Sequence, residues 1–221
     1  MKVELINHTP DPDRAAAHAA LNCYREKIPD KEEMDNGLIL DILNQIKDSG
    51  HHSVIEHASF TFAVHGVSRA LTHQLVRHRL ASYSQQSQRY VDIDDFQPVI
   101  PESILDDEHA SEIFNDLMEK IQKIYNELKD SDIHKEDARY VLPNATKTNI
   151  IITMNARELW HFFSLRCCRR AQWEIRDMAD RMLELCKDVS PIIFENAGAP
   201  CLRGPCPEIP EFSCGKPMRN D

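Results

Sequence analysis

Residues 77–90 read RHRLASYSQQSQRY, and they determine which fold we assign to the chain. Arg77 and Arg79 lie on either side of His78, small polar side chains follow, and Arg89 comes just before the final tyrosine. The 221-residue chain has 36 acidic and 26 basic residues and a formal net charge of -10, so this positive charge is local. The cluster predicts a pocket for an anion, because arginines repel one another unless an anion lies among them.

The composition is ordinary for a soluble protein and excludes several functional classes. An acidic chain as a whole repels nucleic acid and anionic membranes, so we expect neither as a partner. The first residues, MKVELINHTPDPDR, contain no apolar core of signal-peptide length, and no later segment is apolar enough to span a bilayer. We therefore expect a cytoplasmic location, with the seven cysteines kept as thiols.

The acidic residues are distributed unevenly. None occurs between Glu56 and Asp92, although they average about one residue in six over the chain. This window instead holds four arginines and four histidines: Arg69, Arg77, Arg79, Arg89, His57, His65, His73 and His78. Two further basic features are RCCRR at 166–170 and NAR at 155–157, where a strand is expected to give way to a helix. A helix N-terminus favours phosphate, and Arg157 would add further donors.

Hydrophobic periodicity predicts one α/β domain over residues 1–198 and an irregular, Pro- and Cys-containing tail over 199–221. Strands are expected at 3–7, 59–64 and 150–154. Helices are expected at 13–27, from 39 to a C-cap at Gly50, from an N-cap at Ser68 to Arg79, at 113–128, and as one long helix from Asn155. The apolar residues on which the later helices depend are Leu71, Leu75, Val76, Ile113, Leu117, Ile121, Ile124, Leu128, Ile175, Met178, Met182 and Leu185.

The motif Arg77-His78-Arg79, seven residues and then Ser87 resembles the signature of the flavin-dependent thymidylate synthases. Other family blocks occur in order around it: GHHSVIEHASFTF upstream, then ARYVLP, MNAREL..FF..R and AQWEI downstream. Together the matching blocks extend from about residue 50 to 176. The resemblance implies the fold of the thymidylate synthase-complementing proteins, an α/β (α+β) single domain with a central mixed or antiparallel sheet flanked by helices.

The resemblance also implies a function. Family members convert dUMP to dTMP with methylenetetrahydrofolate as carbon donor, and FAD carries a hydride from NADPH. They are homotetramers in which each active site is shared between subunits. The basic signature would then serve the phosphates and the ionising pyrimidine ring.

The same resemblance assigns residues to each ligand. Flavin contacts are expected at Ser53, Arg77, His78, Arg79, Gln85, Asn155, Arg157 and His161, and family positions near the flavin also match at His51 and Glu56. Contacts to dUMP are expected at Gln74, Arg77, Gln85, Gln86, Ser87, Gln88, Arg89, Arg139 and Arg166. Arg166 corresponds to the catalytic arginine that polarises the uracil ring, since a guanidinium beside N3 or O4 favours the ring anion.

The chain departs from the family pattern at a few positions. Gln85 replaces a common glutamate and His161 replaces an asparagine of some members, and residues 167–170 read differently from many relatives. A neutral Gln85 or His161 still forms hydrogen bonds, so these changes affect individual contacts rather than the reaction.

Other interpretations of single residues remain open. Ser87 could be a nucleophile, although no base lies near it in sequence. Cys167 or Cys168, flanked by arginines, could have a lowered pKa and attack the uracil ring, although a free cysteine is often a small core residue. Arg170 could pair with Glu174 one helical turn away.

Two broader alternatives concern the tail and the protein class. Cys201, Cys206 and Cys214 could bind zinc with a fourth ligand, but there is no C-x-x-C knuckle, and we expect no metal. A nucleotide-binding flavoprotein of another reaction would use a similar basic cluster. An RNA- or phosphate-binding module is the remaining class, but such a module usually shows overall basic charge or an aromatic platform.

Overall fold

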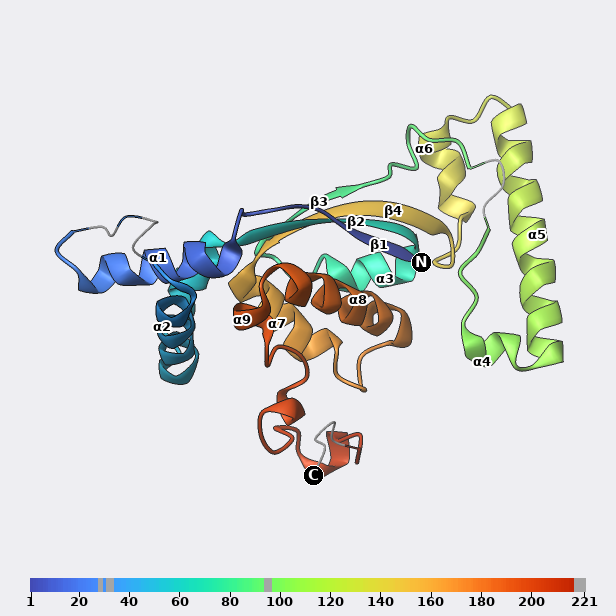
Figure 1. The fold of residues 1–221 in the computed structure, drawn as a ribbon. Coiled ribbons are helices and arrows are strands. Elements are labelled where there is room, and N and C mark those ends of the chain that lie inside the picture. Colours follow the sequence, from blue (N-terminus) through green and yellow to red (C-terminus); the bar gives the residue numbers. More distant parts are fainter. Residues whose placement is uncertain (28–29, 31–33, 94–96, 217–221) are drawn as a thin grey trace. The chain divides into compact units, whose positions relative to one another are not determined.

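The computed structural model describes residues 1–27, 30, 34–93 and 97–216 (Figure 1). It contains a four-stranded antiparallel sheet in the order β1-β2-β4-β3. The strands are β1 (Lys2–His8), β2 (Ser59–Ser68), β3 (Ala81–Gln85) and β4 (Lys147–Asn155). The α+β fold class predicted from the sequence is confirmed. The last five residues of the predicted tail lie outside the described part of the chain.

The chain divides into two compact units. Unit 1 consists of residues 1–2, 64–77 and 84–150, and unit 2 consists of residues 3–63, 78–83 and 151–221. All four strands contribute residues to both units. Among the described helices of either unit, none combines the length and the apolar character that crossing a bilayer requires.

The sheet residues follow the expected two-residue alternation. In β2, Phe60, Phe62 and Val64 are fully buried, as predicted. In β4, the run 150–154 was expected to be a continuous apolar strand, yet only its alternate residues are buried and Ile151 is 37% exposed. This strand therefore buries one face rather than two.

Unit 1 contains the helices α3 (Arg69–Leu75), α4 (Glu102–Leu105), α5 (Glu108–Asp130) and α6 (Lys135–Ala138), and the 3-10 turn η3 (Arg139–Val141). Helix α3 begins as predicted, because the Ser68 hydroxyl accepts the N–H of Leu71 at 3.0 Å. It ends at Leu75 rather than at Arg79, so Val76 lies beyond the helix and is exposed. The predicted core positions Leu71 and Leu75 are confirmed, and Val76 is a correction.

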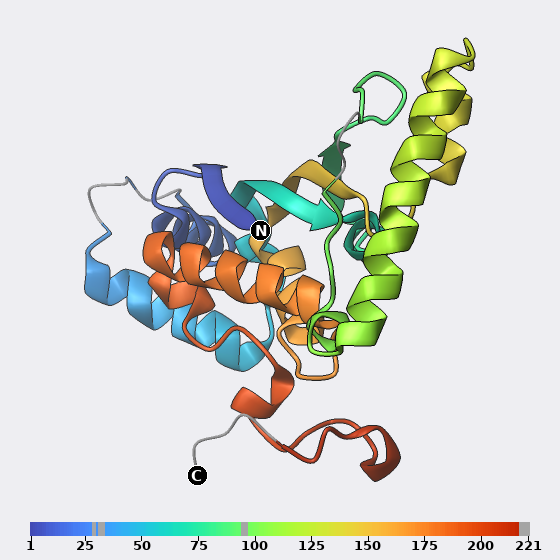
Figure 2. The same ribbon diagram turned by 90° about the vertical axis from the view of Figure 1, so that its right-hand side faces the viewer.

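Helix α5 is a long amphipathic helix, as predicted, and Figure 2 shows it along its full length. Its buried residues are Met118 and Tyr125. Three apolar residues on which the prediction rested, Ile113, Leu117 and Ile124, are each about half exposed, at 55%, 51% and 46%. Helix α5 therefore exposes apolar side chains in addition to those that it buries in unit 1.

Unit 2 contains α1 (Pro12–Tyr24), α2 (Asn36–Ser49), η2 (His52–His57), α7 (Ala156–Arg166), α8 (Trp173–Val189) and α9 (Pro191–Phe194). Two 3-10 turns, η4 (Pro200–Leu202) and η5 (Pro210–Phe212), are the only regular elements of its described tail. Helix α2 ends at Gly50 with a positive φ of 73°, as predicted. The core is aromatic: the Phe194 ring contacts Phe60 and Phe163 edge-on, with centroids 5.3 and 5.9 Å apart.

The single long helix predicted from Asn155 is wrong, because the chain breaks it into α7 and α8. Residues 167–172 form a turn, and the Gln172 side chain accepts the N–H groups of Glu174 and Ile175 to start α8. Of the apolar residues predicted to face the core from this region, Ile175, Met178 and Met182 of α8 are buried. Leu185 is only half-buried, and the neighbouring Cys186 is buried in its place.

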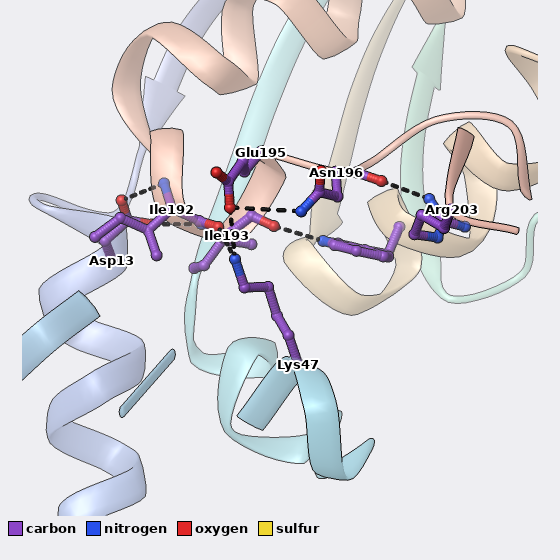
Figure 3. A network of polar contacts seen from close by, with 8 residues as sticks. Asp13, Lys47, Ile192, Ile193, Glu195, Asn196 and Arg203 are labelled. Atoms are coloured by element: carbon purple, nitrogen blue, oxygen red, sulfur yellow. Dashed lines mark hydrogen bonds and ion pairs between the residues drawn. The ribbon is translucent and has the colours of Figure 1, made fainter. Parts of the chain in front are cut away.

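A buried carboxylate holds the end of α8 and the start of α9 (Figure 3). Asp13 of α1 accepts the hydroxyl of Ser190 at 2.6 Å and the N–H groups of Ile192 and Ile193 at 3.0 and 3.1 Å. Lys47 of α2 binds the Ile192 carbonyl and forms a 2.9 Å ion pair with Glu195 (Figure 3). Residues far apart in sequence therefore converge on one short segment of unit 2.

Candidate functional site

The histidine of the RHR motif lies between two side chains of α7. Arg166, the last residue of α7, donates its Nε–H to Nε2 of His78 at 3.0 Å. On the other side of the ring, Nδ1 of His78 lies 3.3 Å from Oε1 of Glu158, near the start of the same helix. His78 and Glu158 are both only 5% exposed, and Arg166 is half-buried. Arg166, the predicted catalytic arginine, is therefore hydrogen-bonded to His78, a predicted flavin-binding residue.

Burial sets the protonation of this cluster. Burial first, and then the charges of Arg166 and His161, lower the pKa of His78 to about 4, so the ring is neutral near pH 7. Burial also lowers the pKa of Arg166, although an arginine remains charged. Tyr83 of β3 donates its hydroxyl to the His78 carbonyl at 2.8 Å, and burial raises the pKa of that phenol. The result is a neutral imidazole held against a guanidinium.

Three other predicted flavin contacts lie at or near the start of α7. Asn155 caps the helix by accepting the N–H of Glu158 at 2.9 Å, and Arg157 forms an ion pair with Glu56. The exposed ring of His161 lies 5.8 Å from that of His78, edge-on. A phosphate-binding site was expected at the N-terminus of α7. One of the backbone N–H groups there is already bonded within the protein, since Ala156 donates to the Ala58 carbonyl at 2.8 Å.

Ser53, another predicted flavin contact, lines a cavity of about 680 Å³ in unit 2. The cavity lies between α1 and η2, and Arg14, His18 and His57 also line it. Its volume is in the range typical of small-molecule sites, and its lining mixes apolar surface with cationic and polar groups. These features fit part of a flavin dinucleotide.

In unit 1, Gln85 is fixed by two threonines. Its amide nitrogen donates to Oγ1 of Thr72 at 3.2 Å and to Oγ1 of Thr148 at 3.4 Å. A glutamate at this position would have no N–H group to donate. The glutamine that replaces it forms hydrogen bonds that the common family residue could not form as a donor. Next to it, the Gln86 side-chain oxygen accepts from Asn149 at 3.3 Å.

Two predicted dUMP arginines share one anchor in α6. Arg89 forms a 2.9 Å ion pair with Glu136, and Arg139 donates its Nε–H to the carbonyl of the same residue at 2.9 Å. Burial, and then the charge of Arg139, lower the pKa of Arg69. Three cationic side chains are therefore gathered in unit 1, which is a suitable environment for a phosphate.

The remaining predicted residues divide between the two units. In unit 1, Gln74, Ser87 and Gln88 are half-buried and Arg77 is exposed. Ser87 accepts the N–H of Arg89 at 3.2 Å, which is the bond of a turn residue. In unit 2, Arg79 and His51 are exposed, and His51 lies 3.4 Å from the hydroxyl of Tyr24.

Cys167 does not have the environment of a nucleophile. Cys167 is 3% exposed, and burial together with Asp180 raises the pKa of its thiol, the opposite of what attack on uracil requires. All seven cysteines are free thiols. Within the described residues, no group of three or more potential ligands is arranged to hold a metal ion. Arg170 pairs with Glu208 at 2.9 Å rather than with Glu174.

Glu158, Tyr83 and Arg69 are site residues that sequence reasoning did not assign to a ligand. Glu158 lies within the MNAREL block, but Asn155 and Glu158 have the spacing of a helix capping box, a local structural pattern. Arg69 was visible only as one of four arginines in the acid-free window. Nothing in the sequence indicates that Tyr83 contacts His78, because that contact depends on the turn between α3 and β3.

Comparison with known proteins identifies the family of the chain. The model of the family described as "Thymidylate synthase complementing protein" matches residues 4–192. The chain is 53% identical to the flavin-dependent thymidylate synthase of Geobacter sulfurreducens, over 98% of this chain and 94% of that protein. It is 45% identical to the enzyme of the same name from Pyrococcus furiosus, over 94% and 90%. The chain is therefore a member of the flavin-dependent thymidylate synthase family of enzymes.

Proposed function

We propose that this enzyme catalyses the reductive methylation of dUMP to dTMP, with methylenetetrahydrofolate as the carbon donor and NADPH as the source of hydride. The methylene carbon is transferred to C5 of the uracil ring, the C5 proton leaves, and a hydride completes the methyl group. Tetrahydrofolate and NADP⁺ are the other products. No protein nucleophile is required.

The contact between Arg166 and His78 is the observation that carries this proposal. A guanidinium held in one orientation beside uracil stabilises negative charge on N3 or O4, and this makes C5 a better carbon nucleophile. The hydrogen bond to His78 is made by the Nε–H group of Arg166, and it fixes the plane of the guanidinium. A half-buried position strengthens its effect on the ring, because the local dielectric constant is low.

For dUMP, we propose the positions assigned by family resemblance, with the phosphate bound by Arg89 and Arg139. The support is their shared anchor at Glu136, together with the charge of Arg139 that acts on Arg69. A phosphate there would relieve the mutual repulsion of these cations. Gln74, Arg77 and residues 85–88 would bind the rest of the nucleotide.

For FAD, we propose contacts from Ser53, Asn155, Arg157 and His161, from the RHR motif and from Gln85. The cavity lined by Ser53 and the ion pair of Arg157 with Glu56 support this set. Bound FAD would supply hydride chemistry that no side chain of the chain provides. The neutral His78 ring would contribute no additional positive charge beside it.

We further propose a cytoplasmic homotetramer with active sites shared between subunits. The exposed apolar residues of α5 support subunit association, because surfaces of this kind commonly mark protein–protein contacts. Within each subunit, residues 1–198 would form the catalytic domain and 199–221 the irregular tail.

The test is an assay of purified protein with dUMP, methylenetetrahydrofolate, NADPH and FAD, scored by chromatography for dTMP. The expected result is dTMP that disappears when flavin is stripped from the protein and omitted. Folded, flavin-loaded protein that forms no dTMP would contradict the proposal and would favour a nucleotide-binding flavoprotein of another reaction. Replacing NADPH with NADH in the same assay measures the nicotinamide preference.

A further inference from the structure

Glu158 and Arg166 lie eight positions apart on α7, yet both reach the same imidazole. At a rise of about 1.5 Å per residue, their backbones lie about 12 Å apart along the helix, so the two side chains need a group between them. Helical side chains lean toward the N-terminus, which directs Arg166 back along α7 toward Glu158. The His78 ring occupies this place, and its two nitrogens contact one partner each.

The chemistry of the two partners permits only one form of His78. A guanidinium only donates hydrogen bonds, so Nε2 of His78 must accept from Arg166 and carries no proton. The proton of the neutral ring therefore lies on Nδ1, which faces Oε1 of Glu158 at a distance of 3.3 Å. An imidazolium, or a ring protonated on Nε2, would present a donor to a donor.

Two aromatic residues also contact His78. Phe162 packs edge-on against His78 with centroids 4.9 Å apart, and Tyr83 holds the His78 carbonyl at 2.8 Å. Arg166 and Glu158 of α7 contact the two ring nitrogens, and these side chains determine which nitrogen carries the proton. Arg166 cannot be deprotonated, so the acceptor Glu158 is the group that a substitution can remove.

We propose that Glu158 is a positioning residue for the reaction: it selects the Nδ1–H form of His78, and that form holds the guanidinium of Arg166 in its catalytic orientation. Glu158 touches neither substrate nor cofactor in this role. The inference rests on the proposed function only for its effect on turnover. Its effect on His78 is independent of substrate, in the way that residues behind metal-binding histidines select a tautomer.

The direct test is long-range ¹H–¹⁵N NMR of the full-length protein labelled in histidine, with His78→Gln used to assign the His78 signals. The expected wild-type result at pH 7.5 is a neutral ring protonated on Nδ1. Glu158→Gln keeps an acceptor oxygen and should keep this form, whereas Glu158→Leu should populate the Nε2–H form. A wild-type ring protonated on Nε2, or an unchanged ring in Glu158→Leu, would overturn the proposal.

Kinetics provide the second readout. We expect Glu158→Leu to lower kcat by about tenfold to a hundredfold with the KM for dUMP changed by less than about threefold, and Glu158→Gln to restore most of kcat. Asp13→Asn is the matched control: Asp13 is a buried acid of unit 2, 6% exposed, whose carboxylate binds Ser190, Ile192 and Ile193, and its substitution should leave the His78 signals unchanged. A loss of kcat equal in the Gln and Leu variants would indicate a merely structural role and contradict the proposal.

Two further outcomes remain informative. If Glu158→Leu does not fold, Glu158→Asp replaces it, because shortening the side chain by one methylene withdraws the carboxylate from Nδ1, and the same tautomer change is expected. If the wild-type protein forms no dTMP, the proposed function fails, while the NMR result still decides whether Glu158 selects the His78 form.

Discussion

Nε of Arg166 donates to Nε2 of His78 at 3.0 Å, and this hydrogen bond joins the RHR motif to the end of α7 within unit 2. The two residues are 88 positions apart in the chain. Sequence comparison assigned one to the flavin and the other to the uracil ring. If both proposed assignments hold, a substitution at either position alters the environment of both ligands.

Replacing Arg166 with lysine should impair chemistry more than binding. Lysine keeps the charge but has neither the planar fork nor the Nε–H that His78 accepts. We expect kcat to fall by about a hundredfold or more, with dUMP affinity by calorimetry reduced less than about tenfold. Arg170→Lys is the control, because Arg170 pairs with Glu208 at a partly exposed site and its substitution should leave kcat within about twofold. Equal kcat values for the two variants would contradict the role of Arg166.

The low pKa of His78 predicts a pH dependence of stability. Because the folded-state pKa is about 4 and the unfolded value is 6.5, the unfolded chain binds the proton more readily between these values. The contribution to stability is fully present above pH 6.5 and is lost as the pH falls toward 4, by at most about 3 kcal/mol.

The measurement is the free energy of unfolding against pH for wild type and His78→Gln. Arg166, Glu158, His161 and Tyr83 also lie around the ring, and burial raises the pKa of Glu158, which gives a slope of the opposite sign. The difference between the two proteins is therefore the quantity of interest. A constant difference from pH 7 to pH 4.5 would show that His78 does not have a lowered pKa.

Arg139 should bind the phosphate of dUMP. Arg139→Gln removes one cation beside Arg69 and Arg89, and a hydrogen bond to a charged group contributes about 2 kcal/mol. We expect dUMP affinity to fall by roughly thirtyfold, with the affinity for deoxyuridine, which lacks the phosphate, unchanged. Arg181→Gln, which removes a surface pair with Asp177 on α8, is the control and should change neither affinity. An equal loss of affinity for dUMP and for deoxyuridine would exclude a phosphate contact.

Local sequence patterns predicted most of the helices and strands, because helix caps and strand alternation depend on residues close together in the chain. The Ser68 cap, the Gly50 C-cap and the alternation of Phe60 and Phe62 each depend on neighbouring residues, and all three are present. The break between α7 and α8 was missed because 167–172 contains neither glycine nor proline. Gln172 starts α8 through its side chain, which is an uncommon N-cap residue.

The site was only partly predictable for a different reason. Family motifs assigned His78 and Arg166 separately, but the contact between them depends on how the turn after α3 meets α7. Glu158 looks like a capping-box residue, and a capping role would leave it at the surface rather than 5% exposed. Burial and pairing of charged side chains are tertiary properties, so no local pattern distinguished these alternatives.

Asp13 should be important for stability rather than for catalysis. Its carboxylate accepts three hydrogen bonds around the start of α9, one from the Ser190 hydroxyl and two from backbone N–H groups. Figure 3 shows the two from the backbone of Ile192 and Ile193. Asp13→Ala leaves these buried donors without an acceptor, and we expect the free energy of unfolding to fall by about 3 kcal/mol or more. Asp177→Ala, at an exposed ion pair, should change it by less than about 0.5 kcal/mol. Urea denaturation of the three proteins makes the comparison, and equal midpoints would contradict the structural role.

Cys167 should be dispensable for chemistry even though it follows Arg166 directly. Its thiol is buried and its pKa is raised, so almost no thiolate exists near neutral pH to attack uracil. We expect Cys167→Ser to keep kcat within about threefold, while the buried hydroxyl lowers the free energy of unfolding by about 1 kcal/mol. Cys23→Ser, at an exposed thiol, is the control for stability. Loss of dTMP formation in the Cys167 variant, with dUMP still bound, would instead support covalent attack by the thiol and remove the need for ring activation by Arg166 alone.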